Sequence, residues 1–143
     1  MRHRIIPAGE GDDYDWAQDH VVVKSPLEVS DGRVTLVEDT LKPGFLLARH
    51  HHRSMVEIFF ILEGVVTFAF DDEAVDAPLG TTVIVPPGVW HEVACPDGGR
   101  LLTLFTPGGF DNYLAELAAL PSNQLDDPDV IRRLGERYDI WTA

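Results

Sequence analysis

The sequence predicts an all-β domain, a sandwich or barrel, followed by two short helices. Three observations support this: short runs of β-branched and aromatic residues, turn residues between them, and a change to helical spacing after residue 107. The predicted strands are residues 21–23, 33–41, 45–52, 56–62, 65–70, 82–85, 89–94 and 101–106. Their spacing of about 8–12 residues is typical of an all-β sandwich or barrel.

The chain divides into an arm, a β-rich body and a helical tail. Residues 1–20 are acidic with little periodicity, which predicts an irregular arm anchored by Trp16. Residues 21–107 hold the predicted strands, and residues 108–143 form the tail. A chain of 143 residues is the size of one domain with a substantial core, so we expect a single domain over residues 1–143.

Two helices are expected in the tail. The first has apolar residues at helical spacing, namely Phe110, Tyr113, Leu114 and Leu117. Asp111 is placed to cap it, and Asp127 followed by Pro128 is a typical start for the second helix. We expect both helices to pack on the outside of the β-rich body.

Charge and composition exclude several classes of protein. Eleven basic and 24 acidic side chains give a net charge of −13, which repels phosphate backbones and anionic lipid headgroups. We therefore expect no nucleic acid and no membrane as a partner. The start of the chain lacks a secretory apolar segment, and a lone cysteine, Cys95, cannot form an internal disulfide. These features favour a cytoplasmic protein.

Histidine carries the strongest functional signal. Four of the six histidines lie in the triplet 50–52 and at position 91. In a strand, residues 50 and 52 point to one face, so His50 and His52 can act together while His51 faces away. The segment 53–55 can turn the chain so that Glu57 opens the next strand facing inward. His91 comes from a third strand.

Three imidazoles and one carboxylate form a mixed nitrogen and oxygen ligand set. Such a set suits one divalent transition metal (Fe, Mn, Ni, Co, Cu or Zn) better than Ca²⁺ or Mg²⁺, which prefer oxygen ligands. Four protein ligands leave one or two positions for water or substrate, and this openness is typical of catalytic metals.

The spacing of these residues resembles the two motifs of the cupin superfamily. The motifs read Gly44-(5)-His50-x-His52-(4)-Glu57-(6)-Gly64 and Gly80-(5)-Pro86-x-Gly88-(2)-His91. The resemblance implies a double-stranded β-helix, or jelly-roll, barrel with a metal held by His50, His52, Glu57 and His91. One departure is Cys95, which stands where the second motif usually has a structural Asn.

The resemblance leaves three functions open. The tail is similar to that of small cupins like the quercetin dioxygenases, which favours a dioxygenase acting on a small aromatic or polyphenolic molecule. Alternatives are a non-redox cyclase or isomerase of aromatic polyketides, and a non-catalytic module that binds a metal or ligand. In the enzymes, Glu57 could also act as a general base. Because cupins commonly pair, we expect a homodimer in which the arm lies across a partner's sheet edge.

Alternation along the strands also predicts roles beside the site. His51 and Arg49 should lie at the surface, although His51 could instead support a ligand. Cys95 is expected to be a small core residue rather than a redox thiol. Phe59 could either pack in the core or contact a planar substrate, and Trp90 should pack under the helices or at a dimer contact.

Overall fold

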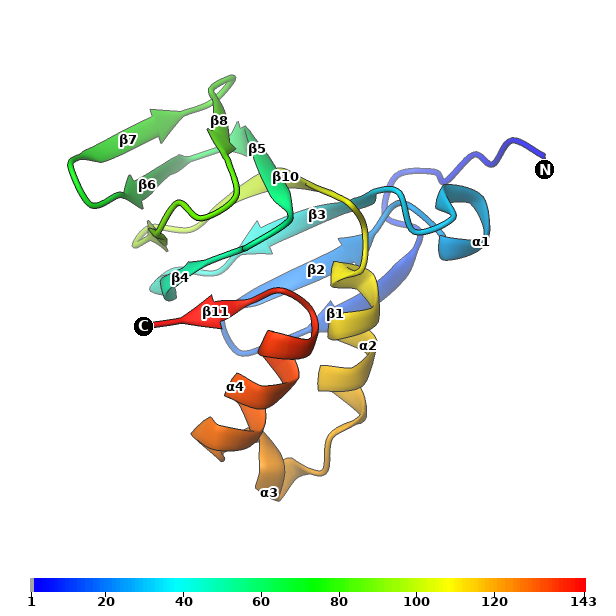
Figure 1. Cartoon of the computed structure of the whole chain (residues 1–143). Helices are drawn as coiled ribbons and strands as arrows, with labels where there is room; N and C mark the ends of the chain where they lie inside the picture. Colours follow the sequence, from blue (N-terminus) through cyan, green and yellow to red (C-terminus); the bar gives the residue numbers. More distant parts are fainter. Residues whose placement is uncertain (1) are drawn as a thin grey trace.

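The computed structural model describes residues 2–143, which form two antiparallel sheets and a group of C-terminal helices (Figure 1). The strands are β1 (Asp12–Asp15), β2 (Asp19–Val23), β3 (Thr35–Leu41), β4 (Phe45–His51), β5 (Val56–Glu63), β6 (Val65–Ala69), β7 (Ala74–Pro78), β8 (Thr82–Val85), β9 (His91–Cys95), β10 (Gly99–Thr106) and β11 (Trp141–Thr142). The helices are α1 (Leu27–Ser30), α2 (Phe110–Ala119), α3 (Ser122–Leu125) and α4 (Pro128–Arg137). The predicted all-β fold with a short helical tail is confirmed.

The strand order differs from the chain order, which brings distant strands together. One sheet has the order β1-β2-β3-β10-β5-β8 and the other β11-β4-β9-β6-β7. In the first sheet, Thr103 of β10 lies opposite both Val37 of β3 and Phe59 of β5. Inward positions of both sheets form an apolar core that includes Phe59, Ile61 and Phe68. The sheets therefore pack face to face, with alternate residues buried.

The N-terminal arm is more regular than the sequence predicts. Residues 12–15 form β1, which pairs with β2 at the edge of the six-stranded sheet. Trp16 stacks on Tyr14 with ring centroids 6.1 Å apart, and both pack against the buried Val21 and Val23. The arm thus extends and covers its own sheet; a contact with a second copy stays a prediction.

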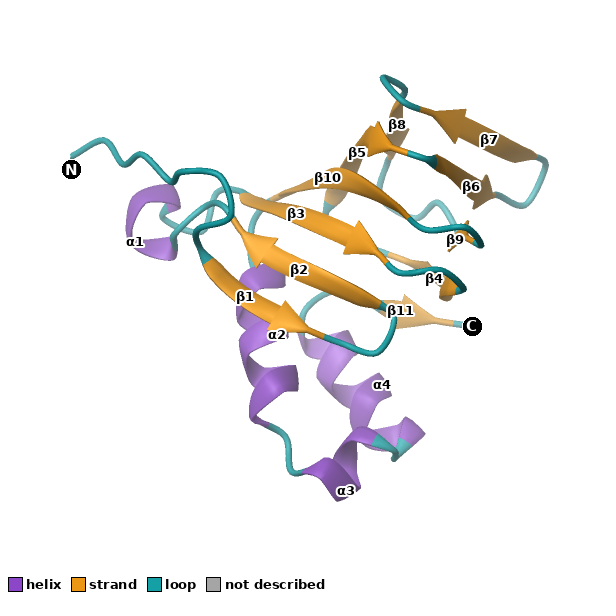
Figure 2. Cartoon of the chain, turned by 180° about the vertical axis from the view of Figure 1, so that it is seen from behind, coloured by secondary structure: helices purple, strands orange, loops and turns teal. Residues whose placement is uncertain are grey.

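The sequence suggested that the tail helices pack on the outside of the body, and this prediction is wrong for α2. Leu114 of α2 packs with Val21, Val37 and Phe105, which face the inside of the six-stranded sheet. This apolar cluster contains no residue of the five-stranded sheet, so the inner face of β2 and β3 would be exposed without α2. Figure 2 shows the helices on this side of β1, β2 and β3. Burial of this apolar surface explains the position of the tail.

The two helix starts are built differently. The Asp127 carboxylate accepts a hydrogen bond from the Asp129 main-chain N–H (3.0 Å), so the predicted cap of α4 is confirmed. Asp111, however, lies in the first turn of α2 and does not cap it; Gly109 precedes the helix instead. The Asp111 carboxylate accepts a hydrogen bond from the Thr35 hydroxyl at 3.0 Å, which ties α2 to β3.

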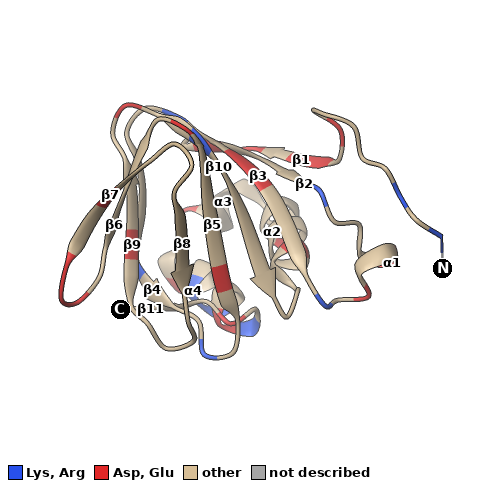
Figure 3. Cartoon of the chain, turned by 90° about the horizontal axis from the view of Figure 1, so that it is seen from above, with Lys and Arg blue, Asp and Glu red and all other residues tan. Residues whose placement is uncertain are grey.

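Acidic residues are spread over the body as well as the loops. Figure 3 shows Asp and Glu on β3, β5 and β9 and in the turns at the ends of the strands.

Among residues 2–143, no helix has the length and apolar character that a bilayer crossing requires.

Candidate metal centre

The four predicted ligands converge inside the molecule. His50 lies on β4 and His52 just beyond it, Glu57 is the second residue of β5, and His91 begins β9. One potential ligand atom from each residue lies within 4.8 Å of those of the other three. All four side chains are buried, with exposed fractions between 0 and 4%. The structure therefore brings together every residue that the motif spacing selected.

Strand register explains how neighbouring residues reach the same point. His50 lies opposite His91 across the β4–β9 pair, and the pairing is irregular between Leu47 and His50. His50 and His52 are both buried, whereas His51 between them is only partly buried. The Gly88 N–H donates to the His52 carbonyl at 2.6 Å, which joins the turn before β9 to the end of β4. Alternation thus sorts the triplet as the sequence predicts.

Each of the three imidazoles is oriented by a main-chain carbonyl. The Nδ1 atoms lie near carbonyl oxygens, at 2.8 Å for His50 and Ala48, 2.9 Å for His91 and Val89, and 2.7 Å for His52 and Asp139. A carbonyl only accepts, so Nδ1 must be the protonated nitrogen. Nε2 of each ring is then free to bind a metal, and a second hydrogen bond of this kind is typical of metal-binding histidines.

Glu57 completes the cluster. Its Oε1 lies 3.1 Å from Nε2 of His52 and 3.1 Å from Nε2 of His91. Burial alone would raise the pKa of Glu57, but the two imidazoles outweigh burial and hold the pKa at about 2. The carboxylate is therefore ionised throughout the neutral range, as a metal ligand must be.

The same cluster acts differently on two of its imidazoles. Burial and the nearby His91 lower the pKa of His50 to about 4, so His50 is neutral at pH 7. Burial also opposes charge on His52, yet the Glu57 carboxylate raises the pKa of His52 above its ordinary value. The buried Glu57 carboxylate thus stabilises a positive charge on the neighbouring His52. A divalent cation would satisfy the same attraction.

A cavity of about 490 Å³ adjoins the cluster. His50, His52 and Glu57 contribute to its wall. The rest of the lining is mainly apolar and comes largely from β4, β10 and the tail: Leu47, Ala48, Phe105, Phe110, Tyr113, Leu125, Pro128, Ile131, Gly135 and Ile140. Its remaining polar residues are Asp126, Arg132 and Thr142. The helices that the sequence placed outside the body thus form much of the wall of this cavity.

Aromatic rings line one side of the cavity. Phe105 and Phe110 stack with centroids 4.3 Å apart and an interplanar angle of 22°, and Tyr113 lies 5.5 Å from Phe110. The His52 and Phe105 rings are nearly perpendicular, with their centroids 6.0 Å apart. Burial raises the pKa of Tyr113, so its hydroxyl stays protonated and can donate a hydrogen bond. Sequence spacing placed Phe110 and Tyr113 on one helix face but did not connect them to the site.

The residues on the opposite face of β4 form a separate group. Trp90 packs against His51, with centroids 4.3 Å apart, and the Arg49 guanidinium lies 4.4 Å from the Trp90 ring centre. Arg49 also pairs with Asp71 at 2.5 Å and is 42% exposed, so its predicted surface position is confirmed. Trp90, just before β9, therefore packs on side chains of β4 rather than under the helices, and its role in a dimer contact stays a prediction. The contact with Trp90 also removes His51 from full exposure.

Cys95 and Phe59 both belong to the core. Cys95 is fully buried, its thiol lies 3.3 Å from the Val65 carbonyl oxygen, and burial raises its pKa, which disfavours the reactive thiolate. Phe59 packs edge to face on Phe68 with centroids 4.9 Å apart, and its ring lies 6.5 Å from that of His91. Phe59 is 4% exposed, so it supports the cluster from within the core.

Comparison with known proteins agrees with this architecture. Residues 37–106 match the family model described as Cupin domain. This match includes all four residues of the cluster. No curated protein matches the chain. Together the two facing sheets and the buried His/Glu cluster, a candidate metal site, define a protein of the jelly-roll class.

Several solved structures share the fold. An RmlC-like cupin from Shewanella frigidimarina is 21% identical, with a TM-score of 0.66 over 77% of this chain and 96% of that chain. KdgF from Halomonas sp. is 15% identical, with a TM-score of 0.67 over 76% and 99%. A predicted oxalate decarboxylase from Thermotoga maritima is 16% identical, with a TM-score of 0.66 over 73% and 99%. The chain belongs to the cupin superfamily.

Proposed function

We propose that this cupin is a metal-dependent enzyme that acts on a small aromatic or polyphenolic molecule, with a dioxygenase reaction as the first choice. One observation carries the proposal: three oriented imidazoles and an ionised carboxylate meet at the wall of an apolar cavity of about 490 Å³. Small-molecule sites are typically concave, mostly apolar and supplied with a few convergent polar groups.

The donor set fits a single divalent transition metal. Nε2 of His50, His52 and His91 and the carboxylate of Glu57 would hold the ion. Such an ion supplies Lewis acidity toward a substrate oxygen and, if it is redox-active, electron transfer to dioxygen. The mixed nitrogen and oxygen donors favour Fe, Mn, Ni, Co, Cu or Zn over Ca²⁺ and Mg²⁺.

The surrounding residues suit a planar substrate with hydroxyl groups. The stacked rings of Phe105 and Phe110 offer a flat apolar wall, which favours an aromatic ring beside them. The Tyr113 hydroxyl can donate a hydrogen bond to a substrate oxygen. Glu57 lines the cavity in its ionised form, so its carboxylate can accept a hydrogen bond from a substrate hydroxyl. These residues bind and orient the substrate while the apolar wall excludes water.

Oxygen consumption tests the proposal directly. The protein is loaded in turn with each of the six metals, given a flavonol, and followed with an oxygen electrode and by product mass. We expect oxygen uptake with at least one redox-active metal, and a loss of at least tenfold in Glu57→Gln, because the amide is not an anionic ligand. Cys95→Ala, in the core away from the cavity, is the matched control and should retain activity.

The alternatives give different outcomes in the same assay. Turnover that persists with Zn²⁺ and without oxygen contradicts the dioxygenase and favours a cyclase or isomerase. If metal binds but neither flavonols nor polyketide-like aromatic compounds are converted, the enzyme proposal is wrong and the chain is a binding module.

A further inference from the structure

The turn between α4 and β11 reaches back to the segment that connects two of the metal-centre residues. Asp139 lies in this turn with φ 65°, a left-handed conformation that residues other than glycine rarely adopt. Its Oδ1 accepts hydrogen bonds from the Arg53 N–H at 2.6 Å and the Trp141 Nε1–H at 3.0 Å. Its Oδ2 accepts from the N–H groups of Ser54 and Met55 at 2.8 and 2.9 Å. One carboxylate therefore holds three successive amides.

The main chain of the same residue orients a candidate ligand. The Asp139 carbonyl oxygen accepts the hydrogen bond from Nδ1 of His52 at 2.7 Å. His50 and His91 use carbonyls only two residues earlier in the chain, those of Ala48 and Val89. His52 alone among the three depends on a residue 87 positions away in the sequence. Its orientation is thus set by the C-terminal segment.

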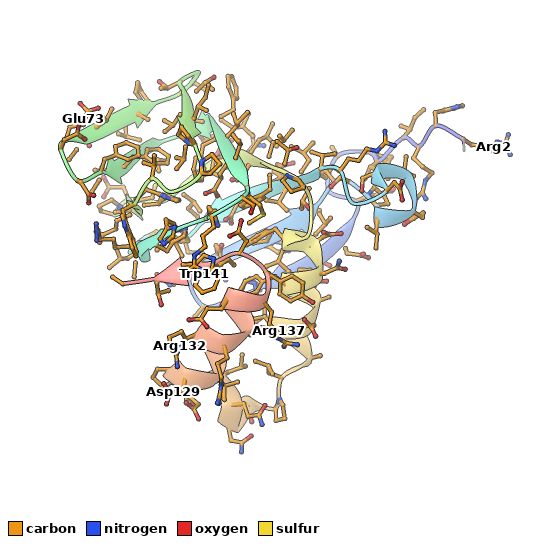
Figure 4. The ribbon with its side chains drawn as sticks, in the orientation of Figure 1. Arg2, Glu73, Asp129, Arg132, Arg137 and Trp141 are labelled. Carbon is orange, nitrogen blue, oxygen red and sulfur yellow. The ribbon has the colours of Figure 1, made fainter. Side chains whose placement is uncertain are left out.

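Charge and stacking reinforce this connection. Burial opposes ionisation of Asp139, but the bonds from the three amides hold its pKa below the usual value, so the carboxylate is charged. Trp141 lies two residues further on, where it pairs with His51 of β4, and the Arg53 guanidinium stands 3.5 Å from its ring centre. Figure 4 shows Trp141 beside the strands, away from the exposed end of α4 that carries Asp129.

A role in ending α4 accounts for only part of these contacts. The Asp139 N–H approaches the Glu136 carbonyl at 3.4 Å, which is a helix-end contact. The carboxylate bonds, in contrast, all leave the helix, and three of them go to residues 53–55. These residues are the link between His52 and Glu57. Ending the helix does not require hydrogen bonds to residues 53–55, so these bonds indicate a second role for Asp139.

The geometry points to Asp139 as a positioning residue of the metal centre: its carbonyl orients His52, and its carboxylate fixes the link that sets His52 against Glu57. The next residue, Ile140, lines the cavity, so one segment both holds a candidate ligand and contacts the substrate space. The inference rests on the proposed function in that the cluster binds a metal. Loss of such a supporting hydrogen bond typically weakens metal binding about 10- to 100-fold.

Two variants and a matched control test this role. Asp139→Gly removes the carboxylate but tolerates the positive φ, and Asp139→Asn keeps one acceptor oxygen in a residue that also tolerates this conformation. Asp31→Gly is the control, because Asp31 also has a positive φ (54°) and ends α1, far in sequence from the cluster. Three quantities are measured for each: Co²⁺ affinity by competition with a chelator, the visible spectrum of the Co²⁺ form, and the His52 ring signals of the metal-free protein by NMR.

We expect Asp139→Gly to bind Co²⁺ about 10- to 100-fold more weakly, with an altered Co²⁺ spectrum and shifted or broadened His52 signals. Asp139→Asn should recover part of the affinity, and Asp31→Gly should match the wild type in all three. Wild-type affinity, spectrum and His52 signals in Asp139→Gly would overturn the inference. Failure of the wild type to bind any metal would overturn the proposed function instead, while the His52 signals of the metal-free variants would still decide the role of Asp139.

Discussion

Two carboxylates face the interior of this protein, and their neighbours give them opposite properties. Glu57 lies between the imidazoles of His52 and His91, and its pKa is lowered to about 2. Asp39 on β3 lies beside Asp19 of β2; burial together with the Asp19 charge raises its pKa to about 9. Burial opposes ionisation at both positions, so the difference comes from the partner side chains.

The comparison shows what each cluster is suited to hold. Glu57 keeps its negative charge inside the molecule, which suits a divalent cation bound with the three imidazoles. Asp39 keeps a proton and donates it in a hydrogen bond to Asp19. The proton on Asp39 removes the repulsion between the Asp39 and Asp19 carboxylates. The His/Glu cluster has the donors and the cavity that a metal site requires.

Removal of a candidate metal ligand should give the largest difference between the His/Glu cluster and the Asp39–Asp19 pair, because only the former is expected to hold a metal. His91→Ala and His52→Ala each delete one of four donors, so metal content by elemental analysis should fall to a small fraction of the wild type. The affinity loss should exceed the roughly 10- to 100-fold typical of losing a supporting residue. His51→Ala is the matched control, because this neighbour faces away from the cluster and should leave the metal content unchanged. Full metal content in both ligand variants would refute the assignment.

The Asp39 carboxyl should control the pH dependence of stability. The folded protein keeps the Asp39 proton up to about pH 9, whereas the unfolded chain releases it near the ordinary value of 3.8. The stabilising contribution is therefore complete below about pH 4 and is lost as the pH rises to about 9. For one proton the slope is about −1.4 kcal/mol per pH unit.

Asp39→Asn removes this dependence. In urea unfolding between pH 5 and 9, the free energy of unfolding of the variant should decline less steeply than that of the wild type. The variant should therefore gain relative stability as the pH rises. Parallel curves for the two proteins would show that Asp39 ionises normally.

A smaller effect is expected at Asp19. Burial raises the pKa of Asp19, but the hydrogen bond from Asp39 and the charges of Lys42 and His20 oppose the shift. Asp19→Asn should therefore flatten the stability curve less than Asp39→Asn in the same unfolding series, while leaving metal content unchanged. A flattening larger than that of Asp39→Asn would reverse the assignment of the proton.

Local pattern predicted the metal centre because the necessary geometry is local. Two histidines separated by one residue share a strand face, and the glycine and proline positions fixed the turns that bring Glu57 and His91 to them. Two of the strands that the sequence missed, β1 and β7, have little β propensity. Residues 12–15 read Asp-Asp-Tyr-Asp, and β7 ends in proline, so both depend on pairing with β2 and β6.

Long-range contacts lay outside the reach of such patterns. The spacing of Phe110 and Tyr113 predicts a helix face, but only the three-dimensional structure shows that this face covers the inner side of β2 and β3 and lines the cavity. Asp139 reads as an ordinary residue after a helix. Its bonds to residues 53–55 span more than 80 positions, and no local signal marks them.

Metal stoichiometry of the wild-type protein tests the central claim most directly. The metal-free protein is titrated with Co²⁺ and followed by visible absorption, and bound metal is counted by elemental analysis after removal of excess ion. The account predicts one ion per chain, with a spectrum typical of nitrogen and oxygen ligands, and its loss in His91→Ala. Binding of less than a tenth of an ion per chain, or equal binding by His91→Ala, would contradict it.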